Sequence, residues 1–69
     1  MDRRVAEQLM KNFLDLSGPL NAATSLTSQI DDKEEQARMR KGIGEIMNIA
    51  YVDLMRPIAS QYPDLDPDR

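Results

Sequence analysis

Apolar residues recur every three or four positions along most of this chain, and one acidic pair, Asp31-Asp32, interrupts them near the middle. Residues spaced in this way share one face of an α-helix. In the first half the series comprises Val5, Leu9, Phe13, Leu16, Leu20, Ala23, Thr27 and Ile30. In the second half it comprises Met39, Ile43, Ile46, Met47, Ala50, Tyr51, Leu54, Met55 and Ile58. The pattern predicts an all-α protein built from two long helices.

Gly18-Pro19 lies inside the first series. A proline within a helix removes one hydrogen bond, and its ring clashes with the carbonyl four residues earlier, here that of Asp15. Alternatively, Ser17 caps a new helix that has Pro19 in its first turn. Because the apolar residues keep their phase across the break, we expect one kinked helix over residues 2–30 rather than two separate helices.

Asp31-Asp32 predicts the turn between the helices. Asp32 is a favourable N-cap residue, and Glu35 stands three positions later, as in a capping box. The second helix is therefore expected to begin near Lys33.

Further prolines shape the end of the chain. We expect Pro57 to kink or end the second helix. After Ser60, two more prolines and alternating aspartates predict an extended acidic tail over residues 61–69. Residues 1–60 would then form the helical hairpin domain. Two interpretations of Tyr62 are open: it packs on the end of the bundle, or it belongs to the free tail.

The short connection forces the two helices to lie antiparallel, with residues paired where their numbers add to about 63. Leu9 would then meet Leu54. Gly18-Pro19 would lie opposite Gly44, and close approach of the two backbones there would explain a helical glycine that costs about 1 kcal/mol relative to alanine.

The small size of the chain argues for oligomerisation. A chain of 69 residues buries little apolar surface alone. Without Cys or His it has neither disulfides nor the usual zinc and haem ligands. The predicted apolar faces are also wider than one neighbouring helix covers. We therefore expect a homodimer that forms a four-helix bundle.

Two sets of residues follow from this expectation. The residues predicted to form the core and the self-association surface are Leu9, Phe13, Leu16, Leu20, Ile43, Ile46, Met47, Ala50, Leu54 and Ile58. A docking surface for a different protein would comprise Leu14, Tyr51 and Met55.

Residue types that perform chemistry are scarce. Neither His nor Cys is present to activate a hydroxyl or to act as a thiol nucleophile. Gly42-Ile43-Gly44 lacks the third glycine of a phosphate-binding pattern, and no strand is predicted before it. We expect no enzyme activity, no cofactor and no metal. The net charge of −3, the lack of an apolar run of membrane-spanning length and a polar first segment predict a cytoplasmic protein.

These observations favour a small interaction protein that acts as a regulator, an adaptor, an antitoxin or an immunity-type binding protein. The alternative is a nucleic-acid-binding regulator that uses Arg38, Arg40 and Lys41. These side chains spread around the predicted helix instead of forming one basic face, which makes this alternative the weaker one. The expected architecture is similar to that of the small plasmid RNA-binding protein Rop, a dimeric helical hairpin, although no motif is shared.

Overall fold

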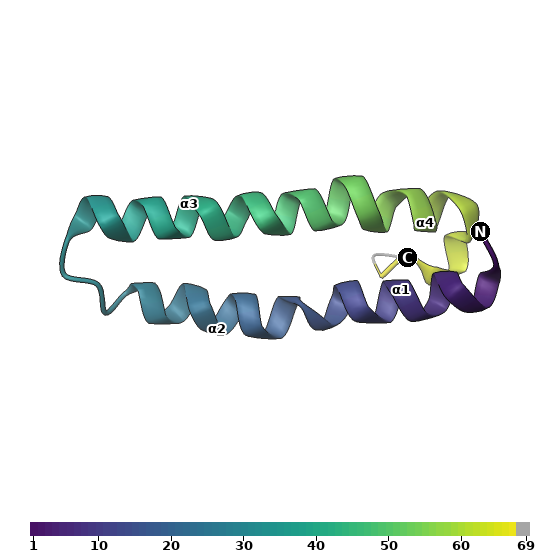
Figure 1. Ribbon diagram of the computed structural model, residues 1–69, viewed down its shortest axis with the longest axis horizontal. Coiled ribbons are helices and arrows are strands. Elements are labelled where there is room, and N and C mark those ends of the chain that lie inside the picture. The colour runs from purple at the N-terminus through teal and green to yellow at the C-terminus, as the bar shows by residue number, and fades with distance from the viewer. Residues whose placement is uncertain (68–69) are drawn as a thin grey trace.

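The chain folds back on itself once, as an antiparallel hairpin of two helical arms (Figure 1). The structure is a computed structural model that describes residues 1–67. The hairpin is 46 Å long and 19 by 16 Å in cross-section. The bounds of its elements are Arg3–Asp15 for α1, Ser17–Thr27 for α2, Lys33–Ile49 for α3, Ala50–Met55 for a π-helical turn, Arg56–Gln61 for α4 and Pro63–Leu65 for a 3-10 turn. The predicted all-α hairpin is confirmed.

The first arm consists of α1 and α2, which meet at Leu16 and stay nearly in line (Figure 1). Leu16 keeps helical dihedral angles, and its carbonyl accepts from the amide of Leu20 at 3.1 Å. The break places Pro19 in the first turn of α2, where a helix does not need the missing N–H. Ser17 does not cap α2, because its hydroxyl donates to the carbonyl of Leu14 at 2.8 Å. The first arm is thus divided at Leu16 into two helices instead of forming the expected single helix over residues 2–30, and its α-helical part ends at Thr27.

The second arm begins as the sequence predicts. The Asp32 side chain accepts from the amide of Glu34 at 3.0 Å and caps α3. Glu34 and Glu35 both lie in the first turn, where the partial positive charge of a helix N-terminus favours carboxylates.

A π-helical turn interrupts the second arm where the sequence predicts regular helix. The amide of Arg56 donates to the carbonyl of Tyr51, five residues earlier instead of four. Pro57 follows at once; it lacks an N–H, and in a regular helix its ring would clash with the carbonyl of Asp53. The wider turn relieves that clash and inserts one extra residue into the arm.

The extra residue exchanges two neighbours between core and surface. Ala50 and Met55, five positions apart, both face the first arm, and Met55 is only 8% exposed. Leu54, predicted to meet Leu9 in the core, is instead 41% exposed. Met55, predicted to belong to a docking surface, lies in the core. The pairing of Leu54 with Leu9 and the exposure of Met55 both assumed a regular helical repeat, and the π-turn makes these two predictions wrong. The place of Leu54 in a self-association surface stays a prediction.

The hydrophobic core lies at the open end of the hairpin, where the first and last described residues come together (Figure 1). Its buried members are Ala6, Met10, Met55 and Ile58, and the partly buried residues packed against it are Leu9, Phe13, Ala59, Tyr62 and Leu65. Towards the loop, the only buried residue of the described chain is Thr27. The packing is therefore dense at one end and sparse at the other.

The glycines of α3 do not serve close packing. A Cβ added at Gly42 or Gly44 would meet no heavy atom of the described residues within 4 Å, apart from its immediate helical surroundings. The predicted close approach of Gly44 to the first arm is therefore wrong.

We expect the Gly44→Ala variant to be more stable than the parent by up to about 1 kcal/mol, because alanine loses less backbone entropy in a helix. Urea denaturation measures this difference. Gly42→Ala serves as the matched control and should give a similar gain. A loss of stability in either variant would show that another chain packs against that glycine.

Candidate interaction surface

The structure distributes the residues predicted for core and self-association over three environments. Two of them, Ala50 and Ile58, are buried within the single chain. Four more are partly buried: Leu9, Phe13, Leu20 and Ile43. The remaining four are exposed in the single chain: Leu16, Ile46, Met47 and Leu54. Of the predicted docking surface, Leu14 and Tyr51 are exposed and Met55 is not.

Exposed apolar side chains line one face of the hairpin along its whole length. We call this set the apolar stripe; it comprises Val5 and Leu26 from the first arm and Met39, Ile46 and Leu54 from the second. Met39 and Ile46 are seven residues apart, so they lie on one side of α3. Ile46 and Leu54 are eight apart, but the π-turn absorbs one residue and brings Leu54 into the same line.

A hollow near the loop joins the two halves of the stripe. It has a volume of about 350 Å³ and is lined by Ala23, Leu26, Thr27, Ile30, Met39 and Ile43. Because Leu26 and Met39 border the same hollow, the stripe residues of both arms share one face. All lining side chains except Thr27 are apolar, and the hollow is open to solvent.

A second apolar depression lies at the waist of the hairpin, between the break at Leu16 and the π-turn. Its volume is about 180 Å³, and it is lined by Phe13, Leu14, Leu16, Ser17, Leu20, Met47, Ala50, Tyr51 and Met55. The small side chain of Ala50 and the widened turn leave this space between the arms. Within it lie Leu14 and Tyr51, the two residues of the predicted docking surface that are exposed.

Polar side chains close the other side of the hairpin near the loop. Gln36 donates to the carbonyl of Thr27 at 2.9 Å, and the Arg40 guanidinium donates to the Thr27 hydroxyl at 2.8 Å. Thr27 is thereby buried with its polar groups satisfied. Near the loop, the polar contacts of Gln36 and Arg40 with Thr27 thus contrast with the apolar lining of the hollow.

The basic residues of the alternative hypothesis do not form one surface. All three residues are exposed, but the Arg40 guanidinium donates to the Thr27 hydroxyl, whereas no such contact with the first arm is found for Arg38 or Lys41 within residues 1–67. Arg38 and Lys41 are three positions apart and lie on one side of α3, whereas the Arg40 guanidinium reaches Thr27 of the first arm.

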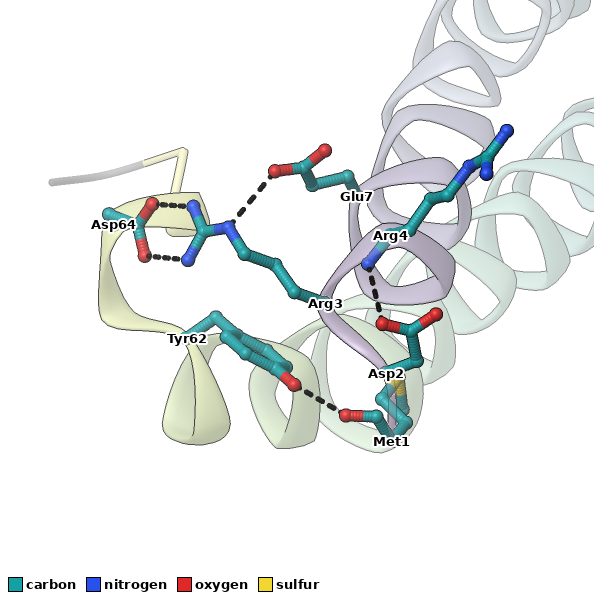
Figure 2. Close-up of polar contacts among 7 residues, drawn as sticks. All are labelled: Met1, Asp2, Arg3, Arg4, Glu7, Tyr62 and Asp64. Carbon is teal, nitrogen blue, oxygen red and sulfur yellow. Dashed lines mark hydrogen bonds and ion pairs between the residues drawn. The ribbon is translucent and has the colours of Figure 1, made fainter.

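A group of contacts between residues at the two ends of the described chain covers the core. We call it the terminal clasp; it comprises Met1, Arg3, Glu7, Tyr62 and Asp64 (Figure 2). Figure 2 shows the Arg3 guanidinium between two carboxylates: it donates to Asp64 through both terminal nitrogens and to Glu7 at 3.1 Å. The same guanidinium lies 5.5 Å from the centre of the Tyr62 ring. The Tyr62 hydroxyl donates to the carbonyl of Met1.

The clasp corrects the expectation of an extended tail. Tyr62 and Leu65 pack against the core, and Pro63–Leu65 forms a 3-10 turn that directs Asp64 towards Arg3. Burial of the two apolar side chains explains why this segment folds back. Asp68 and Arg69 of the predicted tail lie outside the described residues. Hydrogen bonding to Asp64 raises the pKa of Arg3 above its ordinary value.

Residues 1–67 show neither a metal-binding cluster nor a membrane-spanning helix. No three Asp or Glu side chains in this part of the chain lie close enough together to hold a metal ion. None of its helices combines the length and apolar character needed to cross a membrane. Comparisons of the chain with protein-family models, with curated protein sequences and with solved structures find no match.

Proposed function

We propose that this chain is a non-enzymatic helical interaction protein that pairs with a second copy to form a four-helix bundle. In this role it would act as a regulator, an adaptor, an antitoxin or an immunity-type binding protein. The supporting observation is the amount of apolar surface that a single hairpin leaves exposed. Within residues 1–67, twelve large apolar residues are exposed, whereas the buried apolar residues number five.

The accessible area gives this excess a magnitude. The single chain exposes 5176 Å². A compact monomer of 7.9 kDa is expected to expose about 4,400 Å². The excess of about 800 Å² matches the area that each partner buries in a protein–protein interface of standard size. A second copy is the simplest partner, because twofold pairing covers the same patch on both chains.

The waist depression offers a surface for another macromolecule once the stripe is covered. Leu14, Met47 and Tyr51 stay partly exposed there. An apolar patch with an aromatic residue is typical of the centre of a protein–protein interface. We propose this patch as the docking surface, with Met55 removed from the predicted set.

The alternative function, nucleic-acid binding, receives less support. The Arg40 guanidinium donates a hydrogen bond to the Thr27 hydroxyl, and the net charge of the chain is −3. A regulator of this type would show binding to labelled RNA or DNA that falls steeply between about 50 and 200 mM salt. We expect no such binding in a fluorescence anisotropy titration.

Light scattering after size exclusion tests the proposal. Over a concentration series we expect a mass about twice the 7.9 kDa of the chain. A folded monomer at every concentration, with helical circular dichroism, would overturn the proposed pairing. The apolar stripe would then be free to contact a different protein.

A further inference from the structure

We infer that the second copy lies on the apolar stripe in the antiparallel orientation, with its loop beside the terminal clasp of the first. This inference rests on the proposed pairing and adds to it the face and the direction of the partner. Three observations support it: the course of the stripe, the shape of the face and the charge of the two ends.

The face follows from where apolar side chains are continuous. The stripe extends from Val5 and Leu54 near the clasp, through Ile46, to Leu26 and Met39 near the loop. The other side is apolar only at the waist, because Gln36 and Arg40 close it near the loop. Burying that polar side would remove charged groups from water without new partners. A partner of equal length therefore fits the stripe side.

The direction follows first from shape. The hollow of about 350 Å³ occupies the stripe face near the loop. At the other end of the same face, Val5 and Leu54 remain partly exposed beside the packed core. In an antiparallel pair each hollow faces the side chains Val5 and Leu54 of the partner copy, which can fill it. In a parallel pair the two hollows would face each other and leave a void.

The direction follows secondly from charge. The loop end carries four carboxylates within five residues: Asp31, Asp32, Glu34 and Glu35. A parallel pair would bring two such groups together, and like charges at one interface disfavour that arrangement. The clasp end carries charges of both signs: Arg4 and Arg56 are exposed cations, Asp2 is an exposed carboxylate, and Figure 2 shows the Arg4 side chain directed away from the Arg3–Asp64 pair. An antiparallel pair places the acidic loops beside these arginines.

Spin-label distances test the orientation directly. Because the chain contains no Cys, a single introduced Cys takes the only label. Gln29→Cys puts the label near the loop, where residue 29 is exposed. In an antiparallel pair the two labels should be separated by a distance comparable to the 46 Å length of the hairpin. A parallel pair would hold them within about two helix diameters, roughly 20 Å.

Asn48→Cys is the matched control, because residue 48 is exposed and lies near mid-length of the second arm. Its labels should lie within about 30 Å of each other in either orientation, which confirms that a pair has formed. A dimer mass with a short Gln29 distance would overturn the orientation and leave the proposed pairing intact. A monomer mass would overturn both.

A pair of leucine substitutions tests the face. Leu26→Glu places a charge on the stripe, at a side chain that is 61% exposed in the single hairpin, so the hairpin itself should stay folded. We expect the dissociation constant of the dimer to rise at least about tenfold. Leu14→Glu makes the same change at the waist and should leave the dimer mass unchanged. The opposite result, a monomer for Leu14→Glu and a dimer for Leu26→Glu, would overturn the assigned face.

Discussion

Replacement of Ile58 by alanine is expected to lower the free energy of unfolding by about 2–5 kcal/mol. Ile58 is 2% exposed and belongs to the buried core cluster together with Ala6, Met10 and Met55. A chain of this size has a total stability on the order of 5 kcal/mol. The variant should therefore be largely unfolded or melt far below the parent in circular dichroism.

Ile49→Ala is the control for this substitution. It removes the same atoms from a side chain that is 53% exposed, and we expect a change of less than about 1 kcal/mol. Equal losses in the two variants would contradict the position of the core. They would indicate that Ile49 is covered in the assembled protein.

The second large effect concerns the neighbours Leu54 and Met55. Met55→Ala should lower stability by about 2–5 kcal/mol, because the π-turn directs this side chain into the core. Leu54→Ala should change the stability of the hairpin by less than about 1 kcal/mol, because Leu54 lies on the surface of the single chain.

Denaturation at several protein concentrations separates these two effects. The loss in Met55→Ala should be the same at every concentration, since the contacts removed lie within one chain. The effect of Leu54→Ala should instead appear in the concentration dependence of the melting temperature, since Leu54 belongs to the proposed dimer face. The reverse ranking of the two variants would show that the second arm is a regular helix.

Local signals in the sequence account for the architecture. The three-to-four spacing predicted two helical arms, and Asp31-Asp32 predicted the turn and the start of α3 at Lys33. These features depend on neighbours within one helical turn. Pro19 was expected inside one kinked helix, whereas the break lies at Leu16 and Pro19 stands in the first turn of α2; the two segments nevertheless stay nearly in line.

The spacing of apolar residues alone could not predict the register of the last part of the second arm. Ala50, Leu54 and Ile58 fit a regular repeat, and Ala50, Met55 and Ile58 fit a repeat with one inserted residue. The first set fails because Pro57 is incompatible with a regular turn around Asp53. The available signal was Pro57, whose ring would clash with the carbonyl of Asp53 in a regular helix. This proline was interpreted only as a kink or an end of the second helix.

The terminal clasp has no local signal. Arg3 and Asp64 are 61 positions apart, and their contact exists only because the hairpin brings the two ends together. The alternating aspartates and prolines around Tyr62 are typical of an extended segment. Two apolar side chains of this segment, Tyr62 and Leu65, pack against the core, and their burial favours the folded-back conformation over an extended one.

The position of the core at one end implies a gradient of local opening along the hairpin. Amide hydrogens of α1 and α4, beside the core, should exchange with solvent only in near-global unfolding, whereas those around Thr27 and Lys33 should exchange through small, frequent openings. An isolated hairpin thus separates most easily next to the loop that connects its arms. In an antiparallel pair, the well-packed clasp end of each copy lies against the sparsely packed loop end of the other. Assembly would therefore make the frequency of local opening more even along the hairpin.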